Sequence, residues 1–188
     1  MLKPLKEFRK HVLITGLRGL RIENTEEFLK LITREKPANV DVQIFNADGV
    51  ATWQHLYFAA LNALTAFKNK MNISKSIAME TMLYASAQRQ ILKATGILGV
   101  KPSSTEIAIL IIGEKPEALE LALSKISKHI KAKEDETVLE LTDEKAAYVQ
   151  RLFNISNQEL SAVAKRHETK KALVDLVIER MALLATQR

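Results

Sequence analysis

The chain has 188 residues, 47% of them hydrophobic, so it is long enough to bury a core of its own as one domain. It carries 28 Lys and Arg against 22 Asp and Glu, and the net charge of +6 favours an anionic partner. The absence of cysteine excludes disulfide bonds and thiolate metal sites. No apolar run reaches the roughly 18 residues of a membrane span, and the charged first ten residues lack a signal-peptide core, so we expect a cytoplasmic protein without membrane contact.

The first third of the chain predicts alternating strands and helices. Residues 11–16 form a short apolar segment and residues 40–45 begin with alternating apolar and polar side chains, so both predict strands. Between them, Asn24 with a glutamate three residues later has the order of a capping box, and it predicts a helix that ends before Pro37. Residues 52–68 predict a long helix, because apolar side chains recur there at helical period.

One helix is expected to be central to the domain. Residues 76–94 contain neither proline nor glycine, and apolar side chains surround most of the circumference, as in a helix packed on several sides. Its second half nevertheless has four polar side chains that would share one side at helical spacing, namely Ser86, Arg89, Gln90 and Lys93.

Two interpretations of Arg89 stay open. In the first, it pairs with a core carboxylate or emerges into water, which is the usual situation of a charge on a helix. A binding role is favoured by the local charge, because residues 68–101 contain six Lys and Arg and one acid, Glu80. The segment leading into the helix contributes polar and basic side chains, including Lys68, Lys70, Asn72 and Lys75.

The second half of the chain predicts one more clear strand and several helices. Residues 106–113 are apolar on both faces, as in an interior strand, and Pro116 opens a helix. Residues 138–141 predict a fourth strand, and a second capping box begins at Ser156.

Together these elements predict a single α/β domain over residues 1–188. Residues 1–141 form a core with a small mixed sheet of three to four strands packed with helices, and residues 142–188 form C-terminal helices.

Motifs for catalysis are absent from the sequence. The six glycines form no phosphate-binding motif and no nucleophile elbow, and the histidines are too widely spaced for a metal pair. His55 is more simply explained as a polar residue at the start of a helix than as a base. We therefore expect neither an enzyme nor a bound cofactor or metal.

Four segments form a recognisable pattern: QIFNAD at 43–48, ATWQHLYFAA at 51–60, AFKNKMNIS at 66–74 and LYASAQRQI at 83–91. The pattern resembles the TPRKB-type accessory subunit of the KEOPS complex in its archaeal form, and the match continues in order to ERMALL at 179–184. One departure is Ala87, which stands where many members have glycine.

The resemblance implies a non-catalytic α/β subunit that binds a small kinase-like ATPase and supports the formation of threonylcarbamoyladenosine on tRNA. It also implies direct capture of tRNA at its single-stranded 3′ CCA end. Arg89 matches the arginine of the family's helix motif, and Asn72 matches the asparagine of its loop.

We therefore expect Arg89 to contact the terminal nucleotides, because a guanidinium stacks on unstacked bases. Further side chains are expected to bond bases or sugars, namely Gln90, Ser86 and Asn72. A basic rim is expected from Lys68, Lys70, Lys75 and Lys93. The alternative is a protein-only regulator of the kinase-like subunit that makes no contact with RNA.

Overall fold

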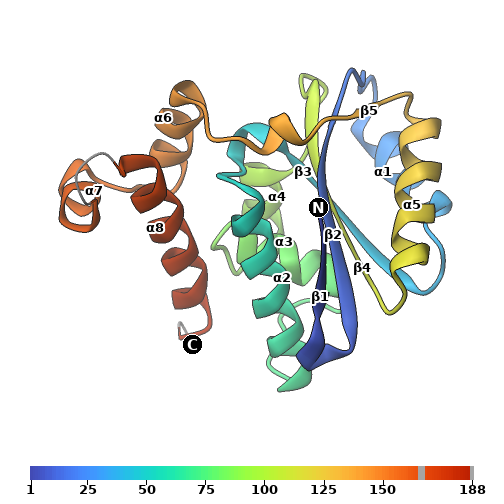
Figure 1. Ribbon diagram of the computed structural model, residues 1–188, viewed down its shortest axis with the longest axis horizontal. Helices are drawn as coiled ribbons and strands as arrows, with labels where there is room; N and C mark the ends of the chain where they lie inside the picture. The colour runs from blue at the N-terminus through green and yellow to red at the C-terminus, as the bar shows by residue number, and fades with distance from the viewer. Residues whose placement is uncertain (165–167, 187–188) are drawn as a thin grey trace.

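The computed structural model describes residues 1–164 and 168–186, which are built around an antiparallel sheet (Figure 1). The strand order is β1-β2-β4-β3, and β5 pairs with β2 beside that path. Every pairing is antiparallel. The strands are β1 (Leu2–Leu5), β2 (Lys10–Arg18), β3 (Val40–Asn46), β4 (Glu106–Gly113) and β5 (Lys133–Glu134).

Helices cover both faces of the sheet. In Figure 1, α1 and α5 lie on one face, α2, α3 and α4 lie on the other, and α6, α7 and α8 lie beyond α2 as an outer layer. None of the helices in the described ranges is long and apolar enough to cross a membrane. The α-helices are α1 (Thr25–Glu35), α2 (Trp53–Lys68), α3 (Ile77–Ala85), α4 (Ile91–Leu98), α5 (Pro116–His129), α6 (Asp143–Leu152), α7 (Asn157–Val163) and α8 (Thr169–Leu184). Short 3₁₀ turns are η1 (Lys6–Phe8), η2 (Ala47–Gly49) and η3 (Glu136–Leu139).

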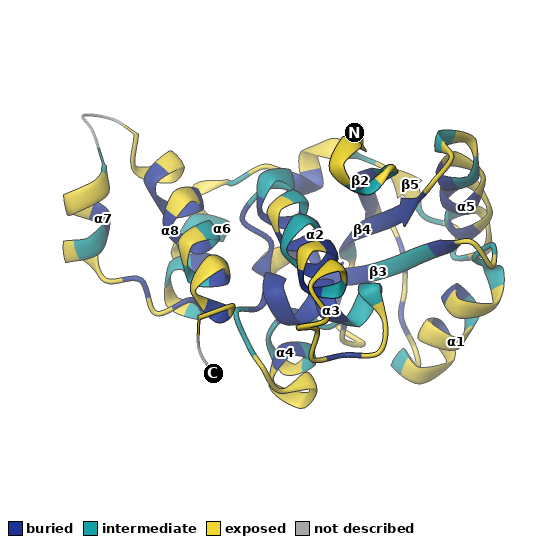
Figure 2. Ribbon diagram, turned by 90° about the horizontal axis from the view of Figure 1, so that it is seen from below, coloured by how far each residue is buried: buried dark blue, intermediate teal, exposed yellow. Residues whose placement is uncertain are grey.

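Strand β4 is the centre of the core, as its sequence predicts. Its odd-numbered isoleucines, such as Ile109, pack towards α1 and α5, whereas Leu110 and its even-numbered neighbours pack towards α2–α4. Both of these side chains are fully buried, and Figure 2 shows the strand as buried. A strand between two helical layers has no solvated face, which explains its continuous apolar run.

The predicted α/β class is confirmed, with two differences in the sheet. It is antiparallel throughout rather than mixed, and it has five strands because β1 and the two-residue β5 join β2. The prediction of a strand at 138–141 is wrong, since Val138 and Leu139 end η3 and the two residues after them are irregular. The Asp135 carboxylate accepts the Thr137 N–H at 2.9 Å and starts a tight turn, which places Val138 and the following leucine in the core without a ladder partner.

Gly16 lets η3 approach the sheet. A Cβ at this position would lie 2.4 Å from the carbonyl oxygen of Asp135 and 2.4 Å from Cβ of Val138. The Asp135 N–H donates to the Gly16 carbonyl at 2.9 Å. The glycine in this strand therefore marks a close backbone approach rather than the end of the strand.

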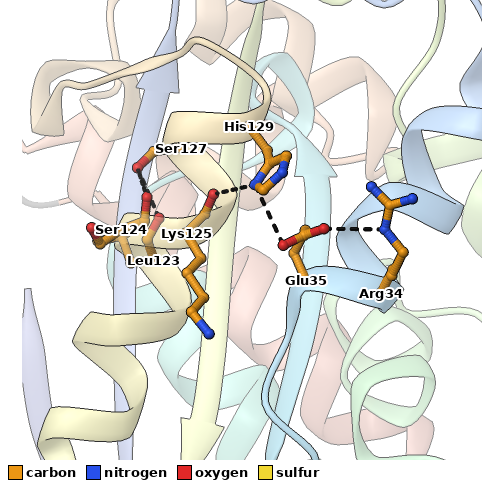
Figure 3. Close-up of polar contacts among 7 residues, drawn as sticks. All are labelled: Arg34, Glu35, Leu123, Ser124, Lys125, Ser127 and His129. Carbon is orange, nitrogen blue, oxygen red and sulfur yellow. Dashed lines mark hydrogen bonds and ion pairs between the residues drawn. The ribbon is translucent and has the colours of Figure 1, made fainter.

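A polar contact joins α1 and α5, which lie on the same face of the sheet (Figure 3). Nδ1 of His129 at the end of α5 lies 3.4 Å from the carboxylate of Glu35 and 3.2 Å from the Lys125 carbonyl. Both neighbours are acceptors, so Nδ1 carries the proton. Arg34 bonds the other carboxylate oxygen of Glu35 at 3.1 Å.

Candidate functional site

The helix predicted over residues 76–94 is two helices, and the prediction of one continuous helix is wrong. Helix α3 ends at Ala85 and α4 begins at Ile91. Ala87 adopts φ +52°, its N–H donates to the Tyr84 carbonyl at 2.9 Å, and the Gln88 N–H donates to the Leu83 carbonyl at 3.0 Å. This pair of bonds is a Schellman motif, which ends a helix with one left-handed residue.

The end of α3 is hard to predict from the sequence because its left-handed residue is an alanine. Glycine normally occupies this position, because a Cβ is strained at positive φ. Ala87 is also where many members of the resembled family have glycine, and its side chain packs against the apolar cluster that includes Phe153 and Leu173 of the C-terminal helices. The turn over residues 86–90 is thus held on its inner side by packing.

Ser86 serves this turn and is not presented to a ligand on a shared helix face. Its residue surface is 2% exposed, and its hydroxyl donates to the carbonyls of Met82 at 2.9 Å and Leu83 at 3.1 Å. The helical spacing that grouped it with the three downstream polar residues does not exist, because the helix stops between them.

Three predicted residues follow the break and lie on the surface. Arg89 and Gln90 are exposed in the turn, and Gln90 is the N-cap residue of α4. Lys93 is exposed in the first turn of α4, beside Leu92, whose surface is 87% exposed. Residues 89–93 therefore expose a guanidinium, an amide, an apolar side chain and an ammonium within five positions of the chain.

The other predicted residues lie before α3, in and around the loop over residues 69–76. Lys68 ends α2, where its Nζ pairs with Glu7 at 2.9 Å and lies 5.8 Å from the ring centre of Phe8. Lys70 is exposed and left-handed at φ +57°. Asn72 is exposed as well, and Lys75 lies exposed one residue before the Ser76 cap of α3.

The predicted residues thus form two groups at opposite ends of α3. The nine residues of this helix span about 13 Å at the usual rise per residue. The loop group consists of Lys68, Lys70, Asn72 and Lys75, and the turn group consists of Ser86, Arg89, Gln90 and Lys93. A ligand that meets both groups must extend along α3.

Glu80 connects the loop group to the core, and the sequence interpretation did not give it a role. It is fully buried, and its carboxylate accepts the Ile73 N–H at 3.0 and 3.1 Å and the Ser74 N–H at 2.6 Å. Because Glu80 is the one acid between residues 68 and 101, the exposed charges of this stretch are all positive. The signal that could have identified it is a single acid on a helix whose other side chains are mostly apolar.

Tyr84 links the two ends of α3 electrostatically. Burial raises the pKa of its phenol, the nearby charge of Glu80 raises it further, and the guanidinium of Arg89 partly offsets both effects. The charges of Glu80 in α3 and of Arg89 in the turn after it therefore both act on the Tyr84 phenol.

His55 is a structural residue and not a base. It is fully buried, its Nδ1 accepts the Ala51 N–H at 3.2 Å, and its Nε2 lies 2.7 Å from the Ala85 carbonyl. Burial lowers its pKa to about 4, so the ring is neutral at physiological pH. No group of three metal-ligating side chains is clustered within residues 1–164 and 168–186.

Comparison with known proteins identifies the family. Residues 20–185 match the family of the kinase binding protein CGI-121. The regulatory protein Cgi121 of Methanocaldococcus jannaschii is 34% identical over 165 residues, which covers 88% of this chain and 98% of that protein. Both descriptions concern binding or regulation, in agreement with the non-catalytic role predicted from the sequence. The resemblance to the KEOPS accessory subunit is confirmed, and the chain belongs to the CGI-121 family.

Proposed function

We propose that this chain is an accessory subunit that binds a kinase-like ATPase of the KEOPS complex and captures tRNA at its single-stranded 3′ CCA end. Membership of a family named for kinase binding supports the first partner. One observation carries the second: Arg89 is exposed on a turn that is closed by a Schellman motif and by the hydrogen bonds of the buried Ser86, in a stretch whose exposed charges are all positive.

The turn group supplies contacts to bases in this proposal. The guanidinium of Arg89 offers a flat cation for stacking on an unstacked base, and the amide of Gln90 offers a donor and an acceptor for a base edge. Ser86 acts indirectly, because its hydroxyl is engaged by α3 carbonyls. Leu92 provides apolar contact for a base or ribose face.

The loop group supplies a second contact at the other end of α3. Asn72 is the expected hydrogen-bonding residue there, and Lys70 and Lys75, together with Lys93 of the turn group, attract phosphates without sequence preference. Lys68 contributes less, since Glu7 already neutralises it in part. The single strand would run along α3 from one group to the other.

Titration of labelled tRNA at two salt concentrations tests the proposal. Affinity should fall steeply with salt, because phosphate contacts release counterions. Removal of the CCA end, or Arg89→Glu in a chain that still folds, should nearly abolish binding. Lys125→Glu on α5, on the opposite face of the sheet, also replaces a cation with an anion and should bind normally.

A protein-only regulator is the competing function. It predicts that trimmed and intact tRNA bind equally weakly, alone or with the kinase-like subunit. Light scattering of the two proteins mixed should give the summed mass in either case, so this measurement tests kinase binding independently of RNA.

A further inference from the structure

We propose that Glu80 is the positioning residue of the loop group: its buried carboxylate holds the loop that carries Asn72 and Lys75 in the conformation that meets RNA. The inference rests on the function proposed above, and it concerns a side chain that touches no RNA itself. The role follows from three observations, which are its burial, its bonds and the sign of its charge.

Burial of a carboxylate is unfavourable unless strong partners replace its water. Glu80 is fully buried in the first turn of α3, yet its partners are not cations but the backbone N–H groups of Ile73 and Ser74. Hydrogen bonds to an ionised acceptor are short and strong, and the one from Ser74 is 2.6 Å long. The groups that stabilise this buried charge are therefore the backbone N–H groups of the loop itself.

The bonds continue from Glu80 to the exposed amide. The Asn72 side chain donates to the Ser74 carbonyl at 2.9 Å, and the Ser74 hydroxyl accepts the Ser76 N–H at 3.2 Å. Ser74 is itself buried, with 7% of its surface exposed. Asn72 is thus two hydrogen-bonded steps from a fixed carboxylate, which limits the positions that its amide can take.

The sign of the charge separates positioning from electrostatics. A negative group beside a surface that binds phosphates opposes that binding, so charge alone predicts tighter binding when Glu80 is neutralised. If Glu80 positions the loop, its neutralisation should instead weaken tRNA binding, because the RNA must then order a loosened loop.

The experiment compares Glu80→Gln with the wild-type chain in tRNA affinity and in hydrogen exchange. Glutamine keeps the shape, removes the charge and places an NH₂ donor against an N–H group. We expect roughly tenfold weaker tRNA binding, the scale of one charge-assisted hydrogen bond, and faster exchange of the Ser74 amide. Unchanged or tighter binding by a folded Glu80→Gln chain would overturn the proposal.

Two further variants control the comparison. Glu120→Gln changes the same charge on the exposed surface of α5, across the sheet, and should leave both measurements unchanged. Glu80→Asp keeps the charge but withdraws the carboxylate by one methylene, so it should weaken binding as well; wild-type affinity would contradict positioning. If neither Glu80 variant folds, hydrogen exchange of the wild-type chain still tests the proposal. Fast exchange of the Ile73 and Ser74 amides would overturn it, because a loop held by Glu80 protects both. Slow exchange in a wild-type chain that binds no tRNA would instead reject the proposed function.

Discussion

The imidazole of His55 and the carbonyl of Ala85, 30 residues apart, are joined by a 2.7 Å hydrogen bond at the end of α3. The opposite ring nitrogen accepts the Ala51 N–H, so the proton lies on Nε2 and the ring is neutral. The ring also meets Phe153 of the segment after α6 edge-on, at 5.5 Å between centroids. One neutral histidine therefore ties the start of α2, the turn that carries Arg89 and the C-terminal helices together.

This arrangement predicts an acid-sensitive fold. The pKa of His55 falls from 6.5 to about 4 on folding, so the unfolded chain binds a proton between these values that the folded chain does not. The free energy of unfolding should therefore fall as pH drops from about 6.5 to about 4, by about 3 kcal/mol in total. Above pH 6.5 His55 should contribute no pH dependence. Urea unfolding at half-unit intervals of pH measures the change.

His55→Gln is the control for this prediction, because an amide can bond the Ala85 carbonyl without titrating in this range. The variant should be less stable at pH 7 but should lose less on acidification. Parallel stability curves for the two chains would show that carboxylates account for the acid sensitivity.

Two glycines predict opposite responses to the same substitution. Gly16→Ala should destabilise the fold by about 3 kcal/mol, because its Cβ would lie 2.4 Å from a backbone oxygen. Gly96→Ala lies in α4, where an added Cβ meets nothing within 4 Å, and should stabilise by about 0.5–1 kcal/mol. Denaturant midpoints measure both. Equal effects of the two variants would mean that η3 does not approach β2 as closely as the structure shows.

The sequence predicted elements whose signals are local. Asn24 caps α1 by accepting the Glu27 N–H, Ser156 forms the full capping box of α7, and the apolar run at 106–113 is the central strand. Strand β1 was missed because Lys3 and Pro4 break its apolar pattern, and an edge strand tolerates both.

The candidate site was less predictable, because its geometry depends on one backbone angle. Ala87 has no local feature that marks a left-handed residue, so periodicity continued the helix through it. The error assigned Ser86 to a ligand face that does not exist. The error did not affect the exposure of the other three residues, since Arg89, Gln90 and Lys93 all lie on the surface. Glu80 was missed as a structural residue because its partners are backbone groups.

The left-handed residues predict stabilising substitutions. Ala87 and Lys131 both follow a helix in a Schellman motif, at φ +52° and +53°. Lys131→Gly should raise the free energy of unfolding by about 1 kcal/mol, since its side chain is exposed and only the strain is removed. Ala87→Gly should gain about half as much, because its packed methyl group is lost. Thermal unfolding ranks the two, and a loss in Lys131→Gly would contradict the assigned backbone angle.

The lysines beside α3 predict a graded response to salt. Lys75 and Lys93 are exposed at opposite ends of the helix, so each should contribute one phosphate contact if the RNA spans both groups. Lys75→Gln and Lys93→Gln should each weaken tRNA binding modestly and reduce the slope of log affinity against log salt by about 1. Lys68→Gln should change the slope less, because Glu7 already pairs with that ammonium. Lys125→Gln on α5 is the control across the sheet and should leave the slope unchanged. A slope that responds to Lys93 but not to Lys75 would confine the RNA to the turn group and exclude a strand that runs along α3.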